Sequence, residues 1–275
     1  MFPIRSTNPT RSRPYVTFGL IGVNTLVFLF MAWGPVDQTV FTYKYGYLPG
    51  ELVLDQEAFA TEMRQHPPGQ PITDRYGRHA IDRSSGNLLL RPNIEAIEAA
   101  TAVPAWVNLL TAMFLHGGWW HLIGNMLYLW IFGSNIEDRL GPWLYVVFYV
   151  GTGVVGNLTH TFFDAGVTPL VGASGAVSGV MGAYILLFPR TRLLAIVPVG
   201  WYPMTVSLPA WMFLGMYFVV QNLYPATFGM GGNVAYWAHI GGFASGAALI
   251  FVFPRSKRPP PPVADMADED ADLVL

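Results

Sequence analysis

Four polar residues stand out because they lie within long apolar segments of the sequence: Ser174, His239, His121 and Asn125. Polar and ionisable side chains are costly inside a membrane, so they indicate function there. A serine hydroxyl becomes a good nucleophile when a base takes its proton, and histidine is the usual base near neutral pH. The set therefore predicts acyl-transfer chemistry.

The same chemistry needs hydrogen-bond donors for the oxyanion of a tetrahedral intermediate. His121 and Asn125 are four residues apart, so they share one face of a helix, and both side chains can donate. A backbone N–H in the glycine-rich stretch GASG (172–175) is a third candidate. Ser178 is interpreted as structural, since a serine in a membrane helix usually serves packing or bonds to its own helix. The same interpretation is given to His116, which lies before the second span, and to Asn157 and His160, near the outer end of the third.

Apolar segments long enough to cross a bilayer must position these residues. The chain has 275 residues, of which 52% are hydrophobic and 12% charged, whereas soluble domains average about 25% charged residues. The predicted spans cover residues 15–33, 119–136, 143–163, 170–188, 209–224 and 234–253. We therefore expect an all-α, polytopic bundle of six transmembrane helices. The proline-interrupted stretch after Arg192 is expected to begin as an interfacial or re-entrant segment.

Basic residues predict the orientation of this bundle. Basic residues precede the first and third spans, follow the last span and occur in the loop after the fourth span. The short loops 164–169 and 225–233 have none. The positive-inside rule therefore places both termini in the cytoplasm. The second, fourth and sixth spans then enter from the other side. At ~1.5 Å per residue, the four polar residues lie in one layer roughly 5–10 Å deep.

The remaining segments flank the predicted core at 106–253. Residues 1–14 are expected to be a cytoplasmic N-terminus, and 34–105 a long extracytoplasmic loop with short helices in 50–65 and 93–100. Residues 254–275 are proline-rich and then acidic, a composition typical of disorder. The chain has no cysteine. No transit peptide is evident, which favours a bacterial cytoplasmic membrane.

Small residues form a stripe on each of two spans. Gly172, Gly175, Gly179 and Gly182 are spaced three, four and three apart, and Ala238, Gly242 and Gly246 are spaced by four. Such faces let two membrane helices approach closely. We expect the fourth and sixth spans to pack together, with Ser174 and His239 at the edge of the contact.

Four motifs in this order resemble the rhomboid family of intramembrane serine proteases: FLHGGWWHLIGN (114–125), IEDRLG (136–141), GASG (172–175) and AHIGGFASG (238–246). The resemblance covers residues 106–253, and the first span also fits the family. It implies a six-helix fold of rhomboid type.

The resemblance also implies roles for individual residues. Ser174 would be the nucleophile and His239 its base, in a dyad without an acidic member. His121, Asn125 and the Ser174 backbone N–H would form the oxyanion hole. Gly172 would permit the tight geometry before the nucleophile. Gly175, Gly242 and Gly246 are expected to support the packing because of their place in the two stripes, independently of the resemblance. Glu137 and Arg139 match a structural pair of the family, here interpreted as a charged cytoplasmic turn.

The implied substrates are single-pass transmembrane proteins, cleaved in or beside their membrane segment. The lipid bilayer is the other expected partner, and neither a metal, a cofactor nor a nucleic acid is implied. Two positions depart from some family members. Ser178 stands where an aromatic ring would stack on the catalytic histidine, and Trp106 lacks a following arginine.

Other membrane-protein classes fit the sequence less well. A zinc intramembrane protease needs an HExxH motif, and an aspartyl protease needs aspartates within its spans; the sequence has neither. A transporter would place its polar site near the midplane between repeats, whereas this layer is off-centre. The alternative that stays open is a rhomboid-like protein that binds membrane proteins with weak or no proteolysis.

Overall fold

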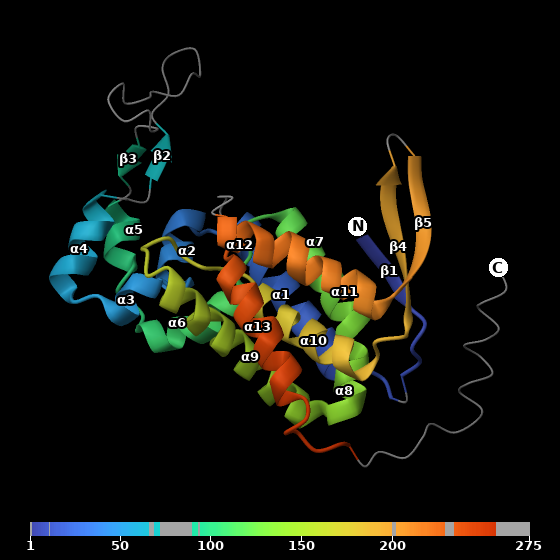
Figure 1. Ribbon diagram of the computed structural model, residues 1–275. Coiled ribbons are helices and arrows are strands. Elements are labelled where there is room, and N and C mark those ends of the chain that lie inside the picture. The colour runs from blue at the N-terminus through green and yellow to red at the C-terminus, as the bar shows by residue number, and fades with distance from the viewer. Residues whose placement is uncertain are drawn as a thin grey trace.

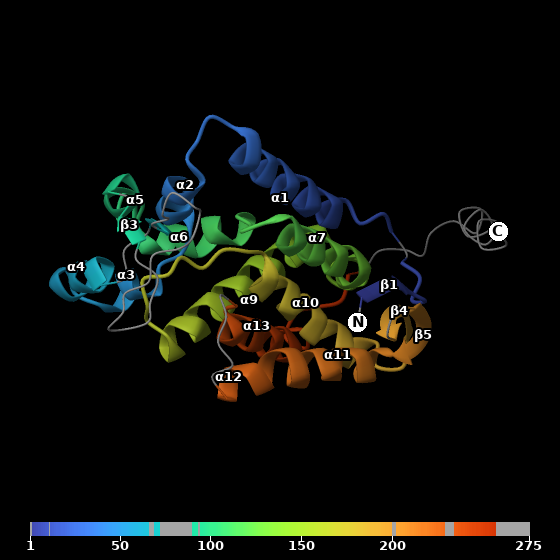
Figure 2. The ribbon, with the colours of Figure 1, turned by 90° about the horizontal axis from the view of Figure 1, so that it is seen from above.

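The computed structural model describes residues 2–10, 12–65, 69–71, 90–92, 94–199, 202–228 and 234–256. A helical bundle forms the middle of the molecule, with a small helical lobe at one end and a three-stranded sheet at the other (Figures 1 and 2). The expectation of a disordered tail falls mostly on residues 257–275, which lie outside the described residues.

Helical segments stand at all six positions where a span is predicted. They are α1 (Tyr15–Trp33), α7 (Trp119–Tyr128) continued by the π-helical η2 (Leu129–Gly133) and α8 (Ser134–Leu140), α9 (Pro142–Phe163), α10 (Ser174–Leu187), α11 (Ala210–Phe218) continued by the π-helical η3 (Val219–Leu223) and α12 (Tyr224–Phe228), and α13 (Tyr236–Leu249). By length and composition, two described helices could each cross a membrane alone, α1 and α9. The count of six crossings therefore stays a prediction.

The lobe is built from the first part of the predicted loop 34–105. It contains α2 (Gln38–Tyr45), α3 (Pro49–Val53), α4 (Gln56–Gln65), β2 (Gly69–Pro71), β3 (Leu90–Pro92) and α5 (Ile94–Ala99). The chain returns to the bundle through α6 (Ala105–Thr111) and the 3-10 turn η1 (Ala112–Phe114). Short helices within 50–65 and 93–100 were expected, and the structure has α3, α4 and α5 there.

A two-way backbone bridge joins the lobe to the loop before α10. The Tyr47 N–H donates to the Leu170 carbonyl at 3.0 Å, and the Leu170 N–H donates back at 2.7 Å. The Tyr47 side chain is fully buried, and its hydroxyl lies 2.6 Å from Thr161 Oγ1 on α9. The lobe is therefore attached to the bundle beside α10.

The expectation of an all-α fold is wrong for the stretch after Arg192. This stretch forms an antiparallel hairpin of β4 (Arg192–Val199) and β5 (Tyr202–Pro209), and β1 (Phe2–Ser6) pairs with the outer side of β4. Leu193 and Ala195 are buried whereas Leu194 is exposed, which is the two-residue repeat of a strand. Prolines obscured this repeat, since proline within a segment argues against a strand unless it lies at an edge, a bulge or a strand start. Here Pro198 and Pro203 face each other next to the hairpin turn.

Glu137, interpreted from the sequence as part of a charged cytoplasmic turn, lies in α8 and is 1% exposed. It accepts hydrogen bonds from the backbone N–H groups of Val16 and Thr17 at 3.0 and 2.8 Å, and from the Thr17 hydroxyl at 2.8 Å. These N–H groups lack partners within α1 because they belong to its first turn. Glu137 therefore caps the N-terminus of α1 from α8.

The helices α10 and α13 pack at backbone distance through the two stripes of small residues. A Cβ at Gly242 would overlap the Gly175 carbonyl, and one at Gly246 would overlap the Gly179 carbonyl. Every residue of α10 from Gly175 to Tyr184 is buried, so α10 is the central helix of the bundle (Figure 2). The outer surface of the bundle exposes large apolar side chains, among them Trp120, Trp143 and Phe162, which are 86%, 83% and 82% exposed.

Candidate active site

Ser174 is the first residue of α10, directly after a sharp turn in the chain. Gly172 has a φ of +124°, a backbone conformation that L side chains rarely adopt. A Cβ at Gly172 would also lie 2.7 Å from the Cε1 and Nε2 atoms of His121. Glycine is therefore required here for two independent reasons, conformation and space.

His239 lies one turn into α13, opposite Ser174. Its Nε2 is 2.8 Å from Ser174 Oγ, a hydrogen bond between residues 65 positions apart in the sequence. The close contact of the glycine stripes brings the two helices near enough for this bond. In this geometry a serine can transfer its proton to a histidine in one step.

The two predicted oxyanion donors lie on α7. A Cβ at Gly172 would lie 2.7 Å from His121 Nε2 and 3.6 Å from Ser174 Oγ, so both atoms border the same small space. Asn125 is one turn further along α7 and is 8% exposed. Its Nδ2 is buried and has no hydrogen-bond partner within the part of the chain that the structure describes. A buried amide donor without a partner is rare and calls for an explanation.

His116, in the loop before α7, lies beside this group of residues. Its ring is 5.1 Å from that of His121, centroid to centroid. Burial and, to a smaller extent, the neighbouring His121 lower the pKa of His116 to about 3. His116 is therefore neutral at pH 7, and its structural role stays a prediction.

The other residues interpreted as structural have partners away from the serine. Ser178 Oγ lies 3.2 Å from the Tyr217 hydroxyl on α11, so it joins two helices. Asn157 Nδ2 donates to the Leu109 carbonyl at 3.1 Å and holds α6 against α9. His160 Nε2 lies 3.7 Å from Asp164 Oδ2 at the end of α9.

Asn222, in the π-helical segment η3, was not among the residues predicted from the sequence. Its Oδ1 lies 2.7 Å from His239 Nδ1, on the opposite side of the imidazole from Ser174. The signal was present in the sequence: an asparagine near the outer end of the fifth predicted span is an intramembrane polar residue. It also lies at the end of the bundle where the other polar residues were expected.

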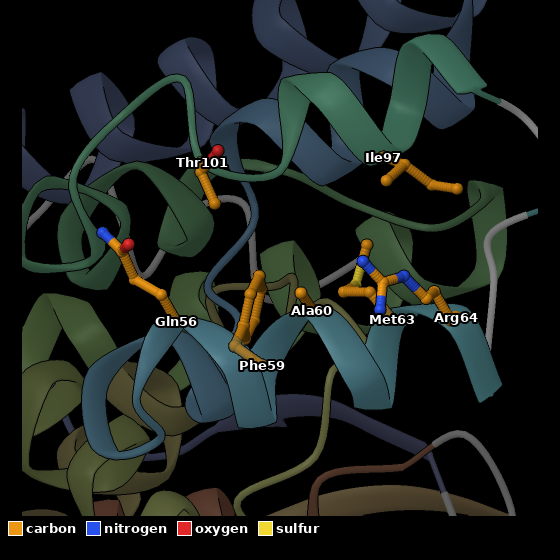
Figure 3. A pocket seen from close by; sticks show the side chains of 7 residues that line it. All are labelled: Gln56, Phe59, Ala60, Met63, Arg64, Ile97 and Thr101. Carbon is orange, nitrogen blue, oxygen red and sulfur yellow. The ribbon is translucent and has the colours of Figure 1, made fainter.

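Metal-binding side chains do not gather within the described ranges. No group of three or more His, Asp or Glu residues there could hold a metal ion. A shallow apolar pocket lies in the lobe between α4 and α5, where Phe59, Met63 and Ile97 line it (Figure 3). None of its lining residues is a predicted site residue.

The comparison with known families decides the classification. Residues 104–256, more than half of the 275 residues, match the Rhomboid domain. The chain belongs to the rhomboid family. As a rhomboid it is an integral membrane protein with a polytopic helical fold, related to intramembrane proteases.

Curated relatives include other rhomboids from bacteria and from organelles. Rhomboid protein 1, mitochondrial, of Saccharomyces cerevisiae is 30% identical over 152 residues, which are 52% of this chain and 41% of that protein. The Putative rhomboid protease YdcA of Bacillus subtilis is 30% identical over 100 residues, 36% of this chain and 50% of that protein. The Rhomboid protease GluP of Bacillus subtilis is 31% identical over 144 residues, 52% of this chain and 26% of that protein.

This rhomboid spans half or less of the length of each of these relatives. The relatives reside in different membranes, since one is named mitochondrial and others are bacterial. Family membership therefore does not fix the bacterial cytoplasmic membrane as the location, which stays a prediction.

Proposed function

We propose that this rhomboid is an intramembrane serine endopeptidase that cleaves single-pass transmembrane proteins within or beside their membrane span. One observation carries the proposal: the 2.8 Å hydrogen bond between Ser174 Oγ and His239 Nε2. Ser174 is the nucleophile and His239 the general base. The alternative of a non-catalytic binding protein gives no reason for these two side chains to meet within an apolar bundle.

The reaction would proceed in two halves. In the first, Ser174 Oγ attacks the peptide carbonyl carbon while its proton moves to His239 Nε2. Collapse of the tetrahedral intermediate breaks the C–N bond, and the same proton passes to the leaving amine. In the second half, His239 takes a proton from water as the water attacks the acyl ester. The C–Oγ bond then breaks and the proton returns to Ser174.

Three donors would stabilise the oxyanion in both halves: Asn125 Nδ2, the His121 ring and the Ser174 backbone N–H. The unpartnered Asn125 amide supports this assignment, because a buried donor without an acceptor costs about 1–3 kcal/mol of stability. An oxyanion that forms during the reaction would satisfy the donor at that moment. Donors held ready in this way lower the energy of the transition state more than that of the ground state.

The substrate must present an extended peptide bond at the start of α10. A stable transmembrane helix hides its peptide bonds, since all its backbone groups are paired internally. Cleavage is therefore expected at substrate segments where the helix is weak or ends.

Labelling with a fluorophosphonate probe tests the activated serine directly. Wild-type protein in detergent should be labelled and should cleave a transmembrane substrate. Ser174→Ala and His239→Ala should each abolish both signals, because each removes one end of the proton-transfer pair. Ser178→Ala is the matched control, since this serine pairs with Tyr217, and it should keep labelling and cleavage.

Two results would contradict the proposal. Unchanged cleavage by Ser174→Ala would exclude Ser174 as the nucleophile. Failure of the folded wild-type protein to react with any fluorophosphonate or substrate would favour the non-catalytic alternative.

A further inference from the structure

We infer that Asn222 is a positioning residue of the active site, which holds His239 in the tautomer that can accept the Ser174 proton. The inference rests on the proposed function. It also answers what orients His239 in a chain with Ser178, rather than an aromatic ring, one turn after the nucleophile. Asn222 is 2% exposed and reaches His239 from a different helix.

The hydrogen bonds of Asn222 have fixed directions. Its Nδ2 donates to the Tyr217 backbone carbonyl at 2.9 Å. A carbonyl can only accept, so the amide nitrogen must face Tyr217 and the amide oxygen must face His239. The alternative amide orientation would bring two acceptors together at Tyr217.

The direction of the next bond follows from the first. Asn222 Oδ1 accepts, so His239 Nδ1 must carry the proton that is donated across the 2.7 Å contact. In the neutral imidazole the other nitrogen, Nε2, is then unprotonated. This nitrogen faces Ser174 Oγ at 2.8 Å and can accept its proton. The Tyr217 carbonyl therefore sets the protonation pattern of the site through Asn222.

The π-helical segment accounts for the position of Asn222. Asn222 lies within η3, five residues after Tyr217, and its side chain donates to the backbone carbonyl of that residue. A π turn interrupts the regular α-helical repeat and is frequent at functional sites. Because of this interruption, a pattern with a 3.6-residue period does not predict the side of the helix on which Asn222 lies.

A neutral amide suits this place better than a carboxylate. A buried carboxylate needs compensation for its lost hydration, and an apolar bundle offers little. The amide supplies the same acceptor oxygen without a charge. A simple role in joining helices would make Asn222 important for stability alone, and the experiment separates the two roles.

The test compares three substitutions at position 222 on full-length protein in detergent. Asn222→Leu keeps the volume and removes the acceptor, so the kcat for a transmembrane substrate should fall by ~10²-fold with little change in KM. The rate of fluorophosphonate labelling should fall in parallel. Asn222→Ala should behave like Asn222→Leu. Asn222→Asp should keep most of the wild-type rate. A neutral carboxylic acid can accept a hydrogen bond from His239 Nδ1 and donate one to the Tyr217 carbonyl, as the amide does.

Asn24→Leu is the matched control. Asn24 is fully buried in α1 and donates to the Leu20 carbonyl of its own helix at 2.7 Å, as Asn222 does to Tyr217. This variant should leave kcat within about twofold of wild type. Thermal unfolding of each variant separates a loss of fold from a loss of rate.

Nitrogen-15 spectra of histidine-labelled protein give a second readout, with His239→Gln to assign the signal. Wild type should show His239 protonated at Nδ1, and Asn222→Leu should show a mixture of tautomers. The inference is overturned if folded Asn222→Leu reacts with the probe at the wild-type rate, or if its His239 tautomer is unchanged. Either result leaves the proposed function standing, whereas an unreactive wild type contradicts the proposed function itself.

Discussion

Gly172 carries more constraint than any other glycine near the nucleophile. Its positive φ and the nearby His121 ring both exclude a side chain, while its N–H donates to the Ala112 carbonyl at 2.9 Å. These three restraints fix the chain two residues before Ser174. The serine is therefore presented by a turn that tolerates only glycine.

Gly172→Ala should accordingly reduce fluorophosphonate labelling strongly. The added methyl group must displace His121 or change the backbone, and strain of this kind costs about 1–3 kcal/mol. If this strain is also present in the transition state, the rate of labelling falls by ~10- to 100-fold. Gly151→Ala on α9 is the control, since nothing lies within 4 Å of its Cβ position. Equal labelling of the two variants would show that the turn tolerates a side chain.

At the level of elements, the contact between α10 and α13 determines the geometry of the dyad. Ser174 and His239 come from different helices, so the distance between them depends on how closely these helices pack. The glycines at positions 175, 179, 242 and 246 allow backbone contact. The hydrogen bond between Ser174 and His239 thus depends on the absence of side chains at these glycine positions.

Gly246→Ala tests this dependence away from the site itself. Its Cβ would overlap the Gly179 carbonyl, and overpacking costs about 1–3 kcal/mol. We expect a lower unfolding temperature and a slower reaction with the probe, because the helices must separate. Gly22→Ala, in α1 with open space around its Cβ position, should change neither quantity. Wild-type stability of Gly246→Ala would mean that the helices can part without cost.

Sequence patterns predicted the elements with unequal success. Membership of the rhomboid family and the helical membrane fold are confirmed, because apolar length and four spaced motifs are local signals. The hairpin β4–β5 was missed, since its prolines resemble a broken helix. The burial of Glu137 was missed as well, because its partners lie about 120 residues away, at the start of α1.

The site shows the same limit. Ser174, His239, His121 and Asn125 could be selected from residue type and depth, and their roles stay predictions. Asn222 was overlooked because its partner lies on another helix and because η3 breaks the α-helical repeat. A one-dimensional pattern does not contain the direction of a side chain in such a segment.

On the scale of the whole molecule, loop contacts fall into two separate groups. At one end, Glu137 bonds to Val16 and Thr17, Ser256 N–H donates to the Arg139 carbonyl, and β1 pairs with β4. At the other end, the lobe bonds to the loop before α10. Segments with an excess of arginine thus meet at one end, and the sheet and the lobe lie at opposite ends (Figure 1). This arrangement supports the predicted cytoplasmic location of both termini.

Single-cysteine variants can test this orientation cleanly, since the chain has no cysteine of its own. A membrane-impermeant maleimide added to intact cells should label Thr61→Cys in the lobe. Arg190→Cys, before the hairpin, should be labelled only after lysis. Both positions are exposed, so access to the reagent depends on the side of the membrane. The reverse pattern would invert the topology and would place the dyad near the cytoplasmic surface.

The bridge between Tyr47 and Leu170 lets the lobe hold the segment of chain that leads to the nucleophile. Only three residues separate Leu170 from Ser174, so a fully extended tether would reach roughly 14 Å. The bond from Gly172 to Ala112 anchors this tether again at its middle. One end of the tether is therefore held by a lobe that contains none of the predicted site residues. Removal of the lobe would release that end and leave the chain before Ser174 to be held by the bond from Gly172 to Ala112.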